Sequence, residues 1–292
     1  MFSISQLEQF SGIKAHTIRI WELRYGALKP SRSEGNTRYY DDSQLKRLLN
    51  IVSLMKTDHK ISQLCLMTDK QHYELLNEQL QNNLDKDETI EYYISQLITA
   101  GMTYDESYFE KIFSNALLRY GMKDVYIKII YPVLVRIGLM WRTGKLPPSH
   151  EHFISNIIRQ KMFAAIDALP PAQPSKDTWL LYLPKWEFHE IGLLFAHYTI
   201  RKAGKRSIYL GANVPVELLE SAVNDISPSN ILVFHVHNSD PALTDKYFSS
   251  IVKIAKGIQI HVSGNLQLIS KLKTRKNFHW IKSVTDLELQ LK

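Results

Sequence analysis

The sequence Trp179-Leu180-Leu181-Tyr182-Leu183-Pro184-Lys185-Trp186-Glu187-Phe188-His189-Glu190-Ile191-Gly192 determines the fold expected for the C-terminal half of the chain. Its first five residues are an apolar run that predicts a buried strand, and apolar residues recur at helical period beyond Gly192. His189 therefore lies on a loop between a strand and a helix, where open α/β sheets bind ligands. Glu187 can hold one ring nitrogen of His189, and Gly192 lets the loop approach a bulky ligand. A plain loop histidine is the alternative interpretation.

Short apolar segments alternate with helical ones through the rest of this half. We expect strands over Trp179–Leu183, Ser207–Leu210, Ile231–His237, Ile258–Val262 and Phe278–Ile281, and helices over Glu187–Ala203, Pro215–Ile226, Pro241–Ala255 and Leu266–Lys273, followed by a short terminal helix. This alternation predicts a doubly wound parallel sheet of flavodoxin-like topology, with the ligand at the carboxyl ends of the strands. Because no G-x-G-x-x-G follows the first strand, the pattern argues against a dinucleotide-binding fold.

Length and composition are those of a multidomain globular protein. The chain has 292 residues, of which 45% are apolar and 22% charged, and its single cysteine, Cys65, excludes an internal disulfide framework. No apolar run is long enough to span a membrane, and Met1–Gln6 lacks the pattern of a signal peptide, so we expect a cytoplasmic location. The net charge of +7 favours a polyanionic partner.

The first 75 residues have the pattern of a helix-turn-helix. One helix is expected from Ser3 or Ser5 to Gly12, and a second from about Lys14 to Gly26. Two short helices about a glycine-containing turn form a candidate DNA reader whose second helix would enter the major groove. The exposed face of that helix would present Lys14, His16, Thr17, Arg19 and Arg24, while Ile18, Trp21 and Leu28 pack inward.

A hairpin and a third helix are expected next. The segment 29–40 predicts a β-hairpin wing around Glu34-Gly35-Asn36, and Asp41-Asp42-Ser43 would cap the helix that follows. Residues 1–60 contain ten Lys and Arg against six Asp and Glu, a local charge of +4 that includes Arg47. A small helical domain with solvated arginines is the alternative interpretation.

The string Thr17-Ile18-Arg19-x-Trp21-Glu22-x-Arg24-Tyr25-Gly26, with Pro30-x-Arg32 and Gly35-Asn36-x-Arg38-Tyr39-Tyr40, resembles the winged-helix DNA-binding domain of MerR-family transcription regulators. The resemblance covers residues 2–70 and implies that the second helix enters the major groove while the wing lies against phosphates. It assigns groove or phosphate contacts to Thr17, Arg19 and Arg24, and wing contacts to Arg32, Arg38 and Tyr39. Trp21 and Glu22 are assigned to packing and to holding the arginines.

Residues 76–168 predict an antiparallel four-helix bundle. Glycine and proline are sparse, and apolar residues recur at spacings of three and four in four runs, the last beginning near His150. This pattern differs from the single long dimerisation helix that many MerR-type regulators carry after the wing. The proline-rich segment 169–177 then separates the bundle from the α/β domain of residues 178–292.

Trp141-x9-Glu151-His152 resembles the motif of the helical bundle that caps the upper face of cobalamin in light-responsive MerR-type repressors. The resemblance implies that Trp141 covers the cobalt face and that Glu151 and His152 contact the upper ligand's sugar or line its pocket. Core packing at a helix end is the alternative for Trp141. Light-sensing members have a cobalt-capturing histidine after this tryptophan. Here that residue is Arg142, which cannot ligate a metal, so a light response is in doubt.

Glu187-x-His189-x-x-Gly192 resembles the cobalamin-binding signature of corrinoid proteins, in which the histidine is the lower cobalt ligand. The stretch 210–215 looks like the second-strand loop of that family, which implies contacts from Gly211 and Val214. Two later motifs depart from the family, since Phe234-His235-Val236-His237 replaces Ser-x-Leu and Ser263-Gly264 replaces a glycine pair at positions that make room for the nucleotide tail. His235 and His237 are either a metal pair or, as we prefer, strand-end residues.

Together these resemblances imply a non-enzymatic transcription regulator, expected to be a repressor, with three parts: a winged helix-turn-helix domain (1–75), a four-helix cap (76–168) and, after the linker, a flavodoxin-like α/β domain (178–292). Adenosylcobalamin or methylcobalamin bound between cap and α/β domain would control a homo-oligomer, a dimer or tetramer, and its binding to double-stranded operator DNA, without a membrane partner. A regulator with a degenerate, cobalamin-independent oligomerisation or docking module is one alternative, and a corrinoid-dependent methyltransferase component is another.

Overall fold

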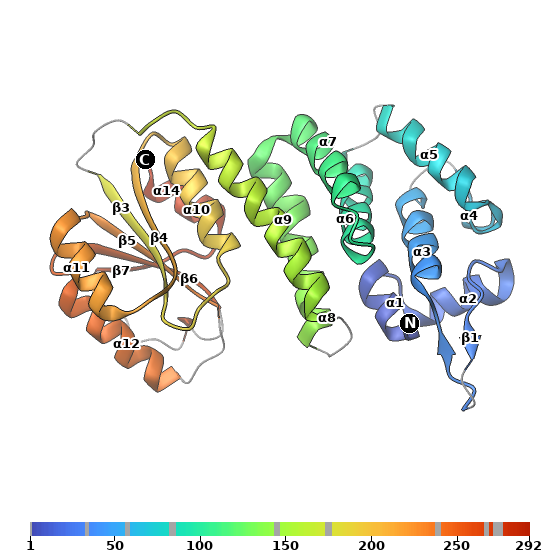
Figure 1. Ribbon diagram of the computed structural model, residues 1–292, viewed down its shortest axis with the longest axis horizontal. Coiled ribbons are helices and arrows are strands. Elements are labelled where there is room, and N and C mark those ends of the chain that lie inside the picture. Colours follow the sequence, from blue (N-terminus) through green and yellow to red (C-terminus); the bar gives the residue numbers. More distant parts are fainter. Residues whose placement is uncertain are drawn as a thin grey trace. The chain divides into compact units, whose positions relative to one another are not determined.

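Figure 1 shows the computed structural model of the chain, which describes residues 2–32, 35–55, 59–81, 86–142, 147–172, 177–236, 241–265, 269–270 and 277–292. The chain forms two compact units, Met1–Ile157 and Ile158–Lys292, and each is described by itself. The division falls inside one helix, α9 (Pro148–Asp167), and not at the proline-rich segment 169–177. The finer three-part division stays a prediction. Across the described ranges, no helix is both long and apolar enough to cross a membrane.

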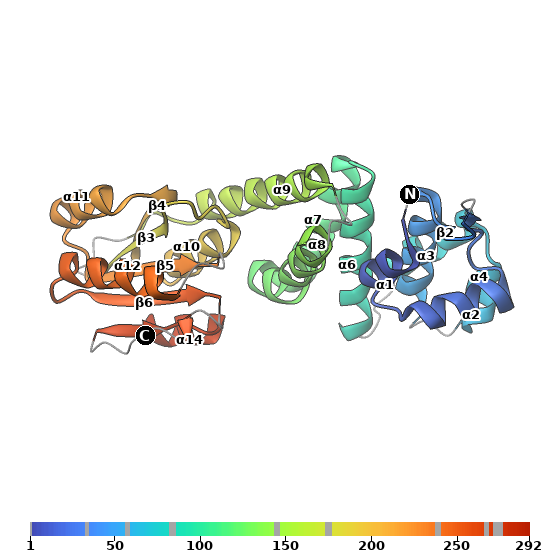
Figure 2. The ribbon, with the colours of Figure 1, turned by 90° about the horizontal axis from the view of Figure 1, so that it is seen from below.

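The first unit begins with the expected helix-turn-helix and wing (Figure 2). Its elements are α1 (Ile4–Ser11), α2 (Ala15–Tyr25), β1 (Ser31–Arg32), β2 (Arg38–Tyr39), α3 (Asp42–Leu54), α4 (Ile61–Leu66) and α5 (Asp69–Gln81). Ser3 caps α1 together with Gln6, and Gly12 ends it with a φ of 72°, which glycine adopts without strain. The wing strands pair antiparallel, and Glu34 at their tip lies outside the described residues. Ile18, Trp21 and Leu28 are buried as expected.

Arg47 is a structural residue of this unit. Its guanidinium donates hydrogen bonds of 2.8 Å to the carbonyl oxygens of Ala27, Cys65 and Met67, and it pairs with Asp69 at 2.7 Å. These contacts satisfy carbonyl groups at the end of α4 and join α3 to the loop after α2. Arg47 is one of the ten positive residues counted over residues 1–60, and its charge is paired within the fold.

Four helical segments follow, as expected. They are α6 (Lys86–Met102), α7 (Glu106–Val125), α8 (Tyr131–Arg142) and the first part of α9, with a π-helical turn, η1 (Tyr126–Ile130), between α7 and α8. Helices α7 and α8 run into each other through η1, and the helical geometry is interrupted at Gly121, whose φ is 72° and ψ 161°. Gly101 lets α6 meet α9 closely, because a Cβ there would collide with the Ile154 side chain.

A buried polar cluster joins α3 to α6 and α7. The Gln96 amide on α6 donates to Asn50 at 3.3 Å and to Ser53 at 3.1 Å, both on α3, and Tyr108 on α7 donates to the Gln96 oxygen at 2.7 Å. Such buried polar groups need matched partners, so the cluster specifies how α3 packs on α6. The cluster is one of the contacts that hold residues 1–157 together as one compact unit.

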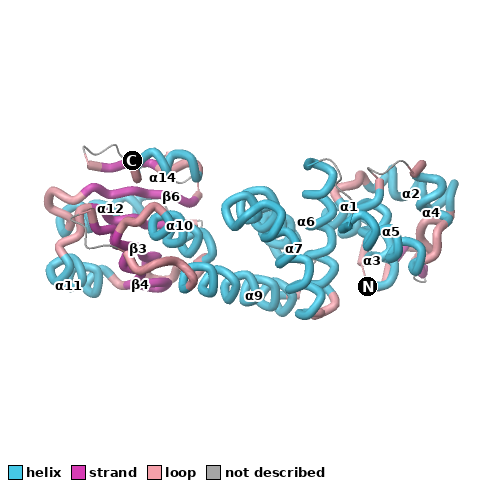
Figure 3. Tube along the Cα trace, turned by 90° about the horizontal axis from the view of Figure 1, so that it is seen from above, coloured by secondary structure: helices cyan, strands magenta, loops and turns pink. Residues whose placement is uncertain are grey.

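The second unit contains the expected parallel sheet, with helices on both faces (Figure 3). The strands are β3 (Thr178–Pro184), β4 (Arg206–Val214), β5 (Asn230–His235), β6 (Gln259–Gly264) and β7 (Phe278–Trp280), and the helices are α10 (Ile191–Lys202), α11 (Val216–Ile226), α12 (Pro241–Ile254) and α14 (Val284–Gln290). The strand order β4-β3-β5-β6-β7 is that of the flavodoxin-like fold. One apolar cluster packs α10 and α14 on the sheet, and another packs α11 and α12 on its opposite face.

Two boundaries differ from the expected ones. Helix α10 begins at Ile191 and not at Glu187, because the intervening residues form a tight loop. Strand β4 extends to Val214, so Gly211 belongs to its irregular end, where the register with β3 shifts, and not to a separate loop. The expected helix 266–273 and the residue His237 fall largely or wholly outside the described residues.

Two buried histidines predict acid sensitivity of the second unit. Burial lowers the pKa of His197 and of His261 to about 4, whereas an unfolded histidine titrates near about 6.5. Below about pH 6.5 the unfolded chain binds protons that the folded chain does not, so the free energy of unfolding falls with pH until about pH 4. We expect a loss of about 2 kcal/mol per histidine between pH 7 and pH 5. Urea unfolding measures it, and an undiminished loss in His261→Gln would contradict this assignment.

Candidate functional sites

A buried carboxylate fixes the loop between β3 and α10. Glu187 is 1% exposed and accepts hydrogen bonds of 3.1 Å at Oε1 from the backbone N–H groups of Phe188 and His189. Its Oε2 accepts a 2.9 Å hydrogen bond from the N–H of Val236, at the end of β5. A buried carboxylate with this many donors is well satisfied, and it ties the loop to the neighbouring strand.

His189 is oriented by the same carboxylate. Its Nδ1 lies 2.5 Å from Glu187 Oε1, and its side chain is 57% exposed. A proton on Nδ1 that is donated to the carboxylate leaves the lone pair on Nε2, which is how proteins orient a metal-ligating histidine and raise its basicity. Within the described ranges, no cluster of three or more His, Cys, Asp or Glu residues is placed to hold a metal.

The end of β4 closes this loop from the other side. The Asn213 side chain accepts from the Trp186 N–H at 2.9 Å, and the Asn213 N–H donates to the Glu187 carbonyl oxygen at 3.1 Å. Gly192 lies in the first turn of α10, and Gly211, with a φ of 81°, belongs to the end of β4, so both expected glycines adjoin the His189 loop. The side chain of Val214 is instead buried in the core with α11.

Ser263 and Gly264 end β6 and are used by the fold. The Ser263 hydroxyl donates to the Ile281 carbonyl oxygen at 2.9 Å. Gly264 has a φ of 124°, and a Cβ there would collide with the backbone of His235 on β5. This glycine permits a close approach of two strands, which is a structural reason for its presence beside any role in making room for a ligand. The expected pair of His235 and His237 stays a prediction, because His237 lies outside the described residues.

Gly264→Ala is expected to lower the free energy of unfolding by about 3 kcal/mol, because the His235 backbone cannot move without disturbing the β5–β6 ladder. Equilibrium urea unfolding measures this change. Gly138→Ala in α8 is the matched control, because nothing lies within 4 Å of its Cβ position, and a helical alanine there should be neutral or stabilising. Equal stability of Gly264→Ala and wild type would contradict the prediction.

In the first unit, the three expected cap residues end α8 and begin α9. Trp141 is 49% exposed, which disfavours the alternative that it is a core residue. The His152 Nδ1 lies 2.8 Å from a Glu151 carboxylate oxygen on the first turn of α9. His150 is engaged by Tyr104, whose hydroxyl lies 3.3 Å from its Nδ1. Arg142 is the last residue of α8, and its side chain lies outside the described part of the chain.

The expected DNA contacts lie on α2 and the wing. The residues Lys14, His16, Arg19 and Arg24 are exposed at or along α2, and Thr17 is half-buried beside His16. On the wing, Arg32 donates to Asn36 at 2.5 Å, and Tyr39 is exposed. Glu22 has its expected role of holding an arginine, since it pairs with Arg38 at 2.8 Å and accepts from Tyr40 at 2.8 Å. The exposed arginines of α2 are suited to phosphate and groove contacts.

Sequence reasoning missed the residue that follows His189. Glu190 accepts a 2.7 Å hydrogen bond from the Tyr209 hydroxyl on β4 and pairs with Arg159 of α9 at 3.3 Å. Along the chain, Tyr209 lies 19 positions and Arg159 lies 31 positions from Glu190, so no local spacing pattern could have joined either residue to it. The sequence signal for Glu190 was the presence of acidic residues on both sides of His189, and this signal does not identify Tyr209 and Arg159 as the partners of Glu190.

Comparison with known proteins identifies two segments. Residues 2–69 match the family described as MerR HTH family regulatory protein, and residues 74–165 match the family described as B12 binding domain. Two curated relatives from Myxococcus xanthus align over most of the chain. The HTH-type transcriptional repressor CarH is 26% identical over 78% of this chain and 76% of its own length, and the HTH-type transcriptional repressor CarA is 25% identical over 86% and 81%.

Among solved structures, the monomethylamine corrinoid protein of Methanosarcina barkeri is similar in fold. It aligns with a TM-score of 0.55 and 10% sequence identity over 68% of this chain and 97% of its own length. At that identity the similarity concerns the fold alone. It agrees with a parallel α/β sheet that follows a helical segment in the second half of the chain.

Proposed function

We propose that this chain, a homologue of the CarH and CarA repressors that joins a MerR-type helix-turn-helix to a B12-binding helical segment, is a DNA-binding repressor controlled by cobalamin. The observation that carries the proposal is the imidazole of His189, which is exposed while a buried carboxylate holds its Nδ1. A histidine prepared in this way is suited to an axial position on cobalt.

The residues of the loop would prepare the site before the cofactor arrives. Glu187 would keep the proton on Nδ1 of His189, so that Nε2 presents its lone pair toward the ligand. The three backbone N–H groups that donate to Glu187 would restrain the loop before the ligand binds, and the ligand would restrain it further. His189 would hold cobalamin through Nε2 as the lower ligand of its cobalt, and the cofactor would supply the metal centre.

The first unit would supply the upper cover and the DNA contacts. Trp141 would cover the upper ligand, and the Glu151–His152 pair would contact its sugar hydroxyls. Cobalamin binding would shift the oligomeric state, a dimer or tetramer, and thereby the number of readers that engage an operator together. Arginine cannot capture cobalt, so Arg142 argues against a light switch of the histidine-capture type.

The test uses the full chain with adenosylcobalamin or methylcobalamin. We expect an absorbance change on binding and, at a ligand concentration about 100 times Kd, stabilisation by about 2.7 kcal/mol. Analytical ultracentrifugation would then report a change in oligomeric state. The affinity of the chain for a selected DNA duplex would differ with and without cobalamin. If neither adenosylcobalamin nor methylcobalamin produces an absorbance change or a thermal shift, the sensor function is refuted.

A second candidate is a repressor whose C-terminal module folds and assembles without cobalamin. Two observations favour it: Val214 is buried in the core, and the Ser263 hydroxyl donates to the Ile281 carbonyl oxygen. Both side chains, which were expected to contact the ligand, therefore have structural roles. Absorbance, ultracentrifugation and duplex binding with and without cobalamin distinguish the two candidates. The second candidate requires that cobalamin changes neither oligomerisation nor DNA binding.

A further inference from the structure

The residue next to His189 is tied to a helix outside the sheet. Glu190 is the N-cap residue of α10, and its side chain is 14% exposed. One carboxylate oxygen accepts from the Tyr209 hydroxyl on β4 at 2.7 Å, and the other pairs with the Arg159 guanidinium on α9 at 3.3 Å. Glu190 therefore joins three elements of the second unit at the position that follows the proposed cobalt ligand.

The two contacts of Glu190 differ in strength. Burial, and then the hydrogen bond to Glu190, raise the pKa of Tyr209, so its hydroxyl stays protonated and donates at every physiological pH. Arg159 is 49% exposed and contacts Glu190 through a single nitrogen, so this pair is worth little in free energy and can open readily. The Tyr209 contact thus fixes Glu190 to the sheet, and the Arg159 contact is the releasable one.

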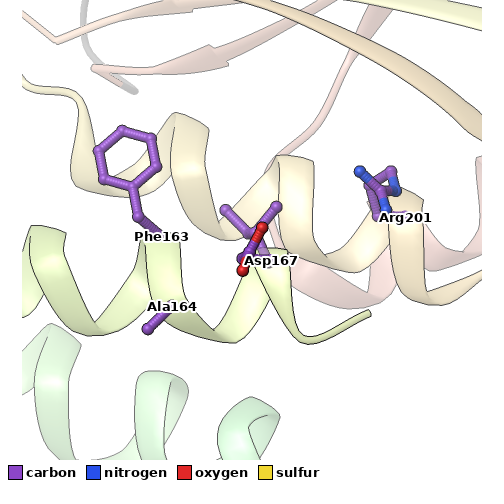
Figure 4. Close-up of a pocket in the computed structure, with 5 residues that line it drawn as sticks. Phe163, Ala164, Asp167 and Arg201 are labelled. Carbon is purple, nitrogen blue, oxygen red and sulfur yellow. The ribbon is translucent and has the colours of Figure 1, made fainter. Parts of the chain in front are cut away.

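Near this contact, α9 and α10 line an open pocket. Figure 4 shows Phe163, Ala164 and Asp167 on α9 and Arg201 on α10 around a cavity of about 470 Å³. Beyond the cavity, Arg201 donates to the Pro170 carbonyl oxygen at 3.0 Å, and Phe163 meets the Tyr209 ring edge-on with centroids 6.4 Å apart. Ile158, Met162 and Ile166 of α9 are buried, so its apolar packing stays in place while the exposed polar contacts open and close.

We propose that Glu190 is a positioning residue that couples the His189 loop to the attachment of α9, through its simultaneous contacts with Tyr209 and Arg159. An ordered His189 loop holds Glu190 in place and retains Arg159, so occupancy at His189 tightens the C-terminal half of α9. The ligand-dependent half of this inference rests on the proposed function, while the contact between Glu190 and α9 does not.

The test is hydrogen exchange of the full chain, read over residues 158–167. In the ligand-free protein, Arg159→Gln is expected to speed exchange there about 2- to 5-fold, as the loss of one partly exposed ion pair allows. Arg159→Lys should restore most of the protection, which a purely steric role of the side chain would not predict. Lys256→Gln removes the same charge from an exposed turn of the same unit and should leave this exchange unchanged.

Adenosylcobalamin then tests the coupling. In wild type it should slow exchange over residues 158–167, and Arg159→Gln should reduce this slowing, because the variant lacks the contact through which the loop and α9 are linked. The visible spectrum of the bound cofactor should stay that of wild type, since His189 and Glu187 are intact. Unchanged exchange in ligand-free Arg159→Gln overturns the coupling, even if cobalamin binds. Failure of wild type to bind cobalamin overturns the proposed function, and the ligand-free exchange still tests the Glu190 contact.

Discussion

His189→Ala is expected to weaken cobalamin binding at least about 100-fold and to change the visible spectrum of any cofactor that still binds. Loss of a residue that only supports a metal ligand costs about 10- to 100-fold in affinity, and loss of the ligand itself should cost no less. The loop should keep its shape, because Glu187 is held by three backbone N–H groups that the substitution leaves in place. Titration followed by absorbance measures both the affinity and the ligation.

Two further variants make this result specific. Glu187→Gln keeps an oxygen that can accept from the loop but removes the charge, so we expect a loss of affinity of about 10-fold with the imidazole still ligating. His279→Ala is the control, because His279 is another partly exposed histidine of the same unit, with its Nε2 2.6 Å from Gln259. Wild-type affinity and an unaltered spectrum in His189→Ala would exclude this residue as the lower ligand.

The double variant Arg19→Ala/Arg24→Ala is expected to lower the affinity for DNA by on the order of 100-fold. Both side chains are exposed on α2, and each phosphate contact that is lost should also reduce the steepness of the salt dependence by about one unit of slope. Binding to a duplex selected by the wild-type chain from a random pool, measured at several salt concentrations, gives the affinity and the slope together.

A matched control separates this effect from net charge. Lys111→Ala removes an exposed positive charge from α7 in the same compact unit and should leave both affinity and slope near wild type. Arg47 is unsuitable as a control, because its guanidinium holds α4 and α5 and its loss would destabilise the reader itself. If the double variant binds with the wild-type slope, α2 does not carry the phosphate contacts.

Several features of the fold followed from short stretches of sequence alone. The boundaries of α1 and α2 follow from Ser3, Gly12 and Gly26, since caps act on the residues next to them. The strand order of the sheet followed from the alternation of apolar runs and helices, because right-handed crossover connections leave few other arrangements. The contact between Glu187 and His189 was expected for the same local reason, as the two residues are two positions apart in one loop.

The tertiary structure decided the features that depend on residues far apart in the chain. The partners of Arg47 lie about 20 positions away, and those of Glu190 lie on β4 and α9, so spacing carries no information about either set. Likewise, a glycine in the sequence does not say whether it faces a ligand or a strand, and at Gly264 the close backbone of His235 supplies the answer. The segments, their order and the Glu187–His189 pair could be predicted before the fold was known, because caps, periodicity and neighbouring side chains are local. The folded chain shows which charges are paired internally, because ion pairs and close approaches form between segments that packing brings together.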